Sequence, residues 1–239
     1  MLARACAVTA YLVGIAGAGV FFLWVLATGT GFVSRTDDAA MGMCPWFGNG
    51  GLLLLFALQH SGMARRSFKN VLTRWAPTHL ERSVYVASAG LTTIALTLCW
   101  QPLPGSLLWH GPIWIVGISL IAAFGLVGCC ATVNHAAYFG LTQAWTGNVN
   151  TRWPLQMNGP YRYVRHPLMV GVLIAIWAQP IMPPELCMMN VGMTVYILIA
   201  LRLEERDLLR EFGEEYEKYQ RKVPALIPFV KRWLYRPGE

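Results

Sequence analysis

Apolar residues dominate this sequence in long runs, and short polar segments with Gly and Pro separate the runs. A helix of about 20 apolar residues spans the ~30 Å hydrocarbon core of a bilayer. The pattern therefore predicts an all-α, polytopic membrane helical bundle of five to six spans. The predicted spans are 5–28, 49–62, 83–100, 112–133, 168–180 and 185–201, and the second and fifth are short enough to leave the count open.

The apolar stretch 168–201 is interrupted by Pro180, Pro183 and Pro184, which predicts a helical hairpin whose two ends return to one side. Helical spacing of Leu, Phe and Tyr continues through 202–222, with Gly213 as a mild breaker. We expect this segment to form a cytoplasmic C-terminal helical cap. One membrane domain, 1–239, would then comprise an N-terminal helical bundle, 1–134, and a C-terminal region, 135–239.

Charge is scarce and unevenly distributed. Hydrophobic residues make up 55% of the chain and charged residues 13%, with a mean hydropathy of +0.44 and a net charge of +7. With six spans and a cytoplasmic N-terminus, 18 of the 19 Lys and Arg residues lie inside, as the positive-inside rule expects. We therefore expect both termini to be cytoplasmic, in a bacterial inner membrane. The positive charge then reflects topology and contact with the lipid bilayer, not nucleic-acid binding.

Residues 1–28 also have features of a signal peptide, namely Arg4, an apolar run and small residues. The run is longer than a usual signal core, which favours a retained first helix. The six cysteines show no ligand-like spacing, so neither a disulfide framework nor a metal site is expected.

The segment 159–167, Gly-Pro-Tyr-Arg-Tyr-Val-Arg-His-Pro, is the first candidate for chemistry. Pro167 disfavours helix at His166, so irregular backbone is expected directly before the hairpin. Such a bend can present side chains and amides to a ligand. Tyr and Arg at a membrane boundary also serve as interfacial anchors without any other function, and the residues alone favour that interpretation.

Glu204 and Glu205 lie just beyond the end of the last predicted span, where carboxylates are costly unless hydrated or paired. Arg162 or Arg165 can pair with them, and so can a cationic ligand or the hydroxyls of a ribose. The alternative is a solvated start of the cap helix. Further along, Glu214–Lys218 and Glu217–Arg221 are predicted to form ordinary i,i+4 pairs.

Asn134 and His135 are polar residues where the fourth predicted span ends, which raises the probability of a site there. A single His at such a position is as often a packing residue as a member of a functional site. His60, at the end of the second span, lies on the same side of the membrane. The segment 65–82, which connects the second and third predicted spans, contains several basic residues and Glu81. We expect these charges to form ion pairs with one another.

The segment 159–228 resembles the isoprenylcysteine carboxyl methyltransferase superfamily of integral membrane methyltransferases. The shared pattern is Gly-x-Tyr, Arg-His-Pro, an apolar hairpin, Glu-Glu, Phe-Gly-x-x-Tyr-x-x-Tyr and Val-Pro-x-x-Ile-Pro. A narrower similarity, to the methanethiol S-methyltransferases, extends over most of the chain. It rests on Gln59-His-Ser-x-Met-Ala-Arg65, Glu81-Arg-Ser-x-Tyr85, Phe139-Gly-Leu-x-Gln143 and Leu203-Glu-Glu-Arg-Asp-Leu208. Two departures from that family's pattern remove charge beside the presumed acceptor. Ala137 and Tyr138 stand where the family tends to have an acidic residue and a Leu, and Thr142 stands where it tends to have an Arg.

The resemblance implies S-adenosylmethionine as cofactor and makes 135–239 the cofactor-binding region. It implies cofactor contacts at Leu155, Gln156, Tyr161, His166, Pro167, Leu168, Met169, Glu204 and Glu205. It also implies a small thiol substrate near Asn134, Tyr138, Phe139 and Gln143.

The expected reaction is an in-line displacement that needs no metal and no covalent protein intermediate. A thiol acceptor must become a thiolate, and a cation or a neutral His assists that step. The candidates are His135, Arg202, Arg165 and His60, of which His135 is preferred. The alternatives are methylation of a prenylcysteine carboxylate or a phospholipid amine, an NADPH-dependent enzyme like the sterol reductases, and a non-enzymatic denitrification-associated membrane protein. The oligomeric state is not predictable from the sequence.

Overall fold

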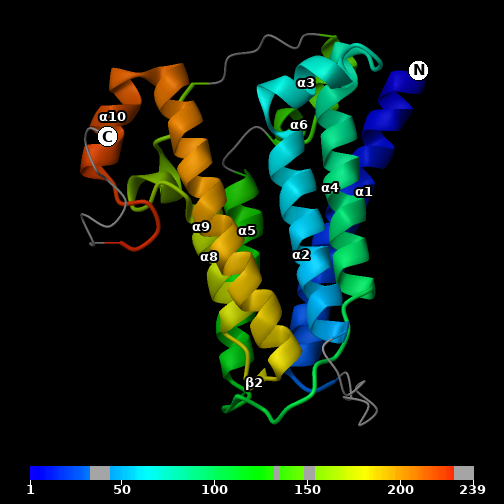
Figure 1. Ribbon diagram of the computed structural model, residues 1–239. Coiled ribbons are helices and arrows are strands. Elements are labelled where there is room, and N and C mark those ends of the chain that lie inside the picture. Colours follow the sequence, from blue (N-terminus) through cyan, green and yellow to red (C-terminus); the bar gives the residue numbers. More distant parts are fainter. Residues whose placement is uncertain (33–43, 132–134, 148–153, 229–239) are drawn as a thin grey trace.

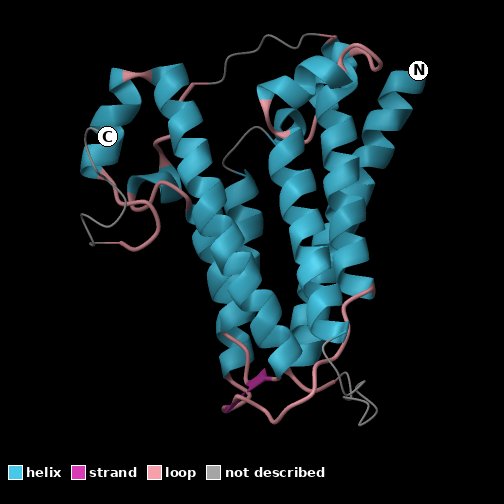
Figure 2. Cartoon of the chain, viewed as in Figure 1, coloured by secondary structure: helices cyan, strands magenta, loops and turns pink. Residues whose placement is uncertain are grey.

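The computed structural model describes residues 1–32, 44–131, 135–147 and 154–228, and their regular structure is almost entirely helical (Figure 2). The predicted all-α class is confirmed, apart from one short antiparallel strand pair. The helices are α1 (Leu2–Gly29), α2 (Cys44–Met63), α3 (Arg66–Leu72), α4 (Glu81–Leu98), α5 (Ile115–Ala131), α6 (His135–Tyr138), α7 (Leu141–Thr146), α8 (Pro167–Trp177), α9 (Pro184–Phe212) and α10 (Glu214–Lys222). Two 3₁₀ turns, η1 (Thr78–Leu80) and η2 (Gly159–Arg162), and the strands β1 (Trp109–His110) and β2 (Ile181–Met182) complete the described elements.

The long helices form two groups that meet at the β2 end and diverge toward the end that carries α3 and α6 (Figure 1). One group contains α1, α2 and α4, and the other contains α5, α8 and α9. A hydrophobic core joins both groups near the β2 end, and it includes Phe21, Phe56, Trp100, Ile176 and Met189. This core leaves the opposite, charged end of the two groups free to hold polar side chains between them.

Helices α1 and α4 cross at glycines. A Cβ on Gly90 would lie 2.4 Å from the carbonyl oxygen of Val13, and one on Gly17 would lie 2.6 Å from that of Gly90. Small residues allow membrane helices to approach closely and gain packing energy from backbone contacts. The first helix is thus an integral part of the bundle.

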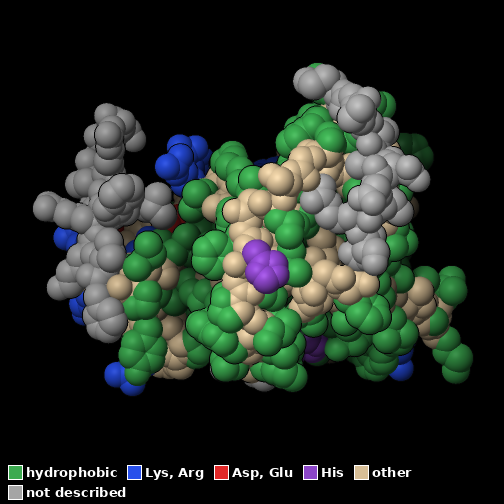
Figure 3. Space-filling view, turned by 90° about the horizontal axis from the view of Figure 1, so that it is seen from below, with side chains coloured by type: hydrophobic (Ala, Val, Ile, Leu, Met, Phe, Trp, Pro, Cys, Tyr) green, Lys and Arg blue, Asp and Glu red, His purple; other side chains and the backbone are tan. Residues whose placement is uncertain are grey.

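Two described helices, α1 and α9, are both long and apolar enough to cross a bilayer. Helices α5 and α8 are apolar but shorter, and the 11 residues of α8 extend only about 16 Å at the rise of an α-helix. Each of the six predicted apolar segments forms a helix over most of its described residues, but these lengths do not establish the count of five to six spans. The face seen from the β1–β2 end is largely hydrophobic (Figure 3).

The predicted cap helix is continuous with the last apolar helix. Helix α9 runs to Phe212, and Gly213, at φ +55°, turns the chain into α10 (Figure 1). A positive φ favours glycine, so the mild breaker predicted at this position is a true helix end. The predicted pairs are confirmed, with Lys218 Nζ 2.8 Å from Glu214 and Arg221 Nη2 2.5 Å from Glu217.

Candidate functional site: a buried clamp beside a tyrosine-lined hollow

Arg165 and Glu205 form a buried ion pair that joins the start of α8 to the last turns of α9. The Arg165 Nε donates to Glu205 Oε1 at 2.8 Å, and Nη2 lies 2.5 Å from the same oxygen. Nη1 donates to the backbone carbonyls of Gln220 and Val223 at the end of α10. The prediction that an Arg of 159–167 pairs with one of the two glutamates is confirmed for this pair.

His166 completes this clamp. Its Nε2 lies 3.1 Å from Glu205 Oε1, and its amide donates to the carbonyl of Ala225 at 3.1 Å. Burial alone disfavours the charged form of Glu205, but the hydrogen bond to His166 and the Arg165 guanidinium outweigh it and hold the pKa of Glu205 below its usual value. Arg165, whose charge Glu205 neutralises, thus positions the chain and is poorly suited to act on a ligand.

Glu204 has a different environment from its neighbour. Successive residues on a helix point about 100° apart, so Glu204 and Glu205 face different surroundings. The Glu204 side chain is 55% exposed, and its Oε2 lies 3.9 Å from His166 Nδ1, beyond hydrogen-bonding distance. Of the two carboxylates, Glu204 is the one that remains available to a ligand.

Five tyrosine hydroxyls lie within electrostatic reach of Glu204. Tyr216 belongs to the buried clamp, and the other four are Tyr85 on α4, Tyr138 on α6, Tyr161 on η2 and Tyr196 on α9. We call these four tyrosines together with Glu204 the tyrosine hollow. The Tyr138 side chain is 48% accessible, so its ring can meet a ligand.

The tyrosine hollow has a distinct chemistry on each wall. On the η2 side, burial and then the Cys129 thiol, to which its hydroxyl is hydrogen-bonded, raise the pKa of Tyr161. On the α9 side, Ser61 donates to Tyr196 at 3.3 Å. Each phenol is therefore neutral at physiological pH, and each presents an aromatic face or a hydroxyl.

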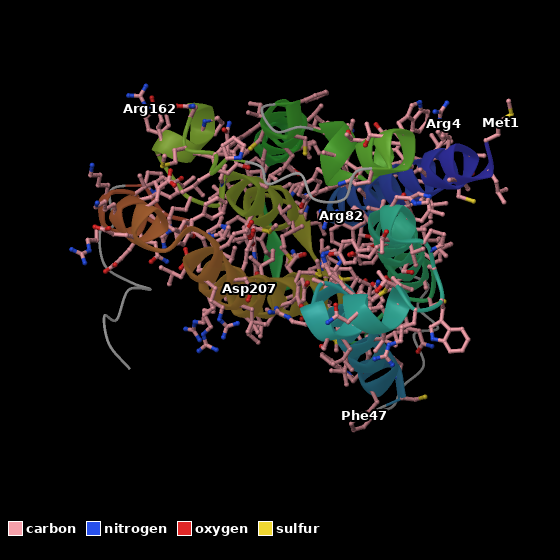
Figure 4. All side chains as sticks on the ribbon, turned by 90° about the horizontal axis from the view of Figure 1, so that it is seen from above. Met1, Arg4, Phe47, Arg82, Arg162 and Asp207 are labelled. Atoms are coloured by element: carbon pink, nitrogen blue, oxygen red, sulfur yellow. The ribbon has the colours of Figure 1, made fainter. Side chains whose placement is uncertain are left out.

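Arg82 lies at the α4–α6 wall of the tyrosine hollow, near the middle of the molecule seen from above, whereas Arg162 lies at its outer edge (Figure 4). The guanidinium carbon of Arg82 is 5.2 Å from the ring centre of Tyr85 and 4.9 Å from that of Tyr138. Its Nε donates to the Tyr138 carbonyl at 2.7 Å. These contacts hold the guanidinium between two rings by cation–π attraction.

His60 adjoins the same wall. Its Nε2 is 3.0 Å from the Tyr85 hydroxyl, and its ring stacks on Phe56 at 5.3 Å. Its Nδ1 is buried and has no hydrogen-bond partner among the described residues. Such an unpaired ring nitrogen is costly unless a ligand or water satisfies it.

His135, the preferred sequence candidate, belongs to a different cluster. Its Nε2 lies 2.9 Å from the Tyr11 hydroxyl, and its ring packs against Phe139 at 4.6 Å. Gln143 donates to the Ala137 carbonyl at 3.1 Å. These contacts fasten α6 and α7 to α1, which is the packing role that the sequence left open for His135.

The other predicted residues are more dispersed. Arg202 and Arg162 are exposed, and Asn134 lies outside the described residues. The residues Leu155, Gln156, Tyr161, Pro167, Leu168 and Met169 are half-buried along the approach to η2 and the first turn of α8. Of these residues, His166 lies 3.9 Å from Glu204, and Tyr161 lies within electrostatic reach of it.

Sequence reasoning missed Arg82, Tyr85 and Tyr196 as members of the site. The ion pairing expected in the connection exists, since Lys69 Nζ lies 3.1 Å from Glu81, but it does not include Arg82. Arg65 instead pairs with Asp207 of α9 at 3.0 Å, across the two helix groups. The only signal for Arg82 and Tyr85 was their position in the motif Glu81-Arg-Ser-x-Tyr85.

Comparison with known proteins agrees with this arrangement. Residues 123–210 match the model of the isoprenylcysteine carboxyl methyltransferase (ICMT) family. Methanethiol S-methyltransferase of Mycobacterium tuberculosis is 37% identical, with 93% of this chain and 98% of that protein aligned. The enzyme of the same name from Crocosphaera subtropica is 40% identical over 75% of this chain and 73% of its own length.

Methanethiol S-methyltransferase 2 of Bradyrhizobium diazoefficiens is 38% identical over 76% of this chain and 73% of its own. No solved structure matches significantly. The match to the Mycobacterium enzyme spans both helix groups, the buried clamp and the tyrosine hollow. The chain therefore belongs to the methanethiol S-methyltransferase family of enzymes, within the isoprenylcysteine carboxyl methyltransferase-like superfamily of integral membrane methyltransferases.

Proposed function

We propose that this enzyme transfers the methyl group of S-adenosylmethionine to methanethiol and releases dimethyl sulfide. The observation that carries the proposal is the half-exposed Glu204 carboxylate with four tyrosines around it. A methyltransferase requires a methyl donor, and S-adenosylmethionine supplies its methyl group on a positively charged sulfonium.

The tyrosine hollow fits such a donor. Aromatic faces attract a desolvated organic cation, and a carboxylate accepts strong hydrogen bonds from ribose hydroxyls or an ammonium group. The proposed donor contacts are Tyr161 and Glu204 at the hollow, with Leu155, Gln156, His166, Pro167, Leu168 and Met169 along the approach to it. Glu205 contributes indirectly, because it holds His166 beside Glu204.

A small, apolar acceptor fits the opposite wall. The relatives aligned over most of the chain are named for methanethiol. The accessible Tyr138 ring gives this wall an uncharged aromatic surface, which suits a small apolar thiol.

The residues of the chain itself promote the transfer by positioning and by excluding water. The buried Arg165–Glu205 clamp holds η2, α8 and α10 in fixed relation to Glu204. The tyrosine rings replace bulk water around the reacting sulfur atoms. The sulfonium cation and the thiolate anion react to give two neutral thioether sulfurs, so the exclusion of water lowers the barrier to methyl transfer.

The proposed topology has both termini in the cytoplasm and five to six spans, of which α1 and α9 are the clearest. The charged end of the bundle, with α3, α10 and the tyrosine hollow, then faces the cytosol that supplies the donor. The hydrophobic helix faces admit the acceptor, because methanethiol partitions into the bilayer. The helical cap and the assignment to the inner membrane belong to the same proposal.

Equilibrium binding of radiolabelled S-adenosylmethionine to the purified, detergent-solubilised protein tests the donor assignment. Glu204→Gln should weaken binding at least tenfold, because it removes the charge that attracts the donor. Glu211→Gln, an exposed carboxylate on the same helix, is the matched control and should bind normally. Normal binding by Glu204→Gln, or binding of NADPH in place of S-adenosylmethionine, would contradict the proposal.

A further inference from the structure

Arg82 is a cation without a carboxylate partner among the described residues. Two neighbouring basic residues do have carboxylate partners, Lys69 with Glu81 and Arg65 with Asp207. Arg82 instead lies between the rings of Tyr85 and Tyr138, and its Nε binds a backbone carbonyl. An arginine stays protonated at any physiological pH, so this wall of the tyrosine hollow carries a permanent positive charge.

The charge of Arg82 acts directly on the groups around it. It acts electrostatically on His60, Tyr85 and Tyr138, and none of the three compensates it with a negative charge. Phenols and a neutral imidazole leave the guanidinium's field directed into the hollow. A fixed cation flanked by neutral groups favours a bound anion.

His60 holds this wall in place. Its Nε2 lies 3.0 Å from the Tyr85 hydroxyl, and its ring stacks on Phe56. Its Nδ1 is buried, so an acceptor cannot touch it, and the adjacent Arg82 charge disfavours a second positive charge on the imidazole. Arg82 is therefore the group of this wall that can act on the acceptor.

We propose that Arg82 is the catalytic cation that stabilises the acceptor as a thiolate. This inference rests on the proposed function and assigns the acceptor side of the same site. Glu204 and Arg82 then divide the hollow by charge, with the carboxylate attracting the cationic donor and the guanidinium attracting the anionic acceptor.

The step balances without any further reactant. The S–H bond of the acceptor breaks as the thiol ionises beside Arg82, and its proton passes to water. The sulfur lone pair forms the new bond to the methyl carbon, and the electron pair of the breaking C–S bond remains on the donor's sulfur as a neutral thioether. Arg82 is unchanged.

The test compares Arg82→Met and Arg82→Lys with the wild-type enzyme in detergent, over a range of pH, with methanethiol and S-adenosylmethionine. Arg82→Met should lower kcat/KM for the thiol about 100-fold, as loss of a donor to a developing anion does. It should also move the acid limb of the pH–rate profile, where the rate rises as the thiol ionises, upward by about one unit or more, and leave donor affinity within threefold. Arg82→Lys retains the charge and should recover at least tenfold. Arg74→Met, an exposed arginine in the same connection, is the matched control.

The outcomes separate this inference from the proposed function. A wild-type enzyme that makes no dimethyl sulfide overturns both. An active wild-type enzyme with an unchanged pH profile in Arg82→Met overturns the role of Arg82 alone. Equal loss in Arg82→Lys and Arg82→Met, with a lowered unfolding temperature in both, assigns Arg82 to fastening α4 to α6 and likewise overturns the inference.

Discussion

Arg165 Nη2 and Glu205 Oε1 lie 2.5 Å apart inside the protein, although 40 residues separate them in the sequence. The helical hairpin α8–α9 brings them together, and His166 and Tyr216 contact the same carboxylate. Because α10 also binds Arg165 through its last carbonyls, the pair determines where Glu204 and η2 lie. The geometry of the proposed donor site therefore depends on a contact that does not touch the donor.

Removing the charge of Glu205 should destabilise the protein strongly. Glu205→Gln leaves Arg165 buried without its counterion, a change that costs about 3–5 kcal/mol in comparable cases. Thermal unfolding in detergent measures this cost. Glu214→Gln removes an exposed i,i+4 pair and should change the free energy of unfolding by about 0.5 kcal/mol or less. Equal effects of the two substitutions would show that the buried pair contributes little.

The same pair predicts a dependence of stability on pH. Since the pKa of Glu205 is lowered in the folded protein, its ionisation stabilises the fold at every pH above the unfolded-state value of about 4.3. That contribution is lost as pH falls through the lower, folded-state pKa. The gap in unfolding temperature between wild type and Glu205→Gln should therefore be constant near neutral pH and narrow below about pH 4. A gap that widens in acid would mean the opposite sign for the shift.

Neither of the two histidines should be essential for turnover. His60→Gln places an amide near Nε2, so the Tyr85 contact can persist, and the buried Nδ1 does not reach the acceptor. His135→Gln should also leave kcat within about twofold and lower the unfolding temperature, because His135 packs against Tyr11 and Phe139. Initial rates measure both effects. A loss of kcat of about tenfold or more in either variant, with an unchanged unfolding temperature, would restore that histidine as the catalytic candidate.

The crossing of α1 and α4 should not tolerate a methyl group. Gly90→Ala puts a Cβ 2.4 Å from the Val13 carbonyl, so the helices must move apart, at a cost of about 1–3 kcal/mol. Gly19 lies on α1, and a Cβ there meets nothing within 4 Å, so Gly19→Ala should leave the stability unchanged or raise it slightly. Unfolding temperatures of the two variants compare the sites directly. An equally stable Gly90→Ala would contradict the close packing.

Much of the fold was predictable, because hydrophobic periodicity and length determine where membrane helices form. The helix end at Gly213, the Glu214–Lys218 pair and the Arg165–Glu205 pair all follow from local spacing or from charge next to hydrocarbon. The span count does not follow, since the 11-residue α8 shows that an apolar run need not form a full-length helix.

The acceptor wall of the site was less predictable for a physical reason. Arg82, Tyr85, Tyr138 and Tyr196 come from α4, α6 and α9, and no sequence spacing relates those helices. In the sequence, Arg82 follows Glu81 and resembles half of a surface ion pair. Only the three-dimensional arrangement shows that Glu81 pairs with Lys69 and that Arg82 lies between two aromatic rings.

Methyl transfer itself is the most direct test of the central claim. Purified protein in nanodiscs would be incubated with methyl-labelled S-adenosylmethionine and methanethiol, and labelled dimethyl sulfide would be measured in the headspace. We predict labelled dimethyl sulfide that depends on both substrates and is strongly reduced in Glu204→Gln. Normal donor binding with no labelled dimethyl sulfide, and transfer instead to a prenylcysteine or phospholipid acceptor, would contradict the assignment of a small thiol to this site.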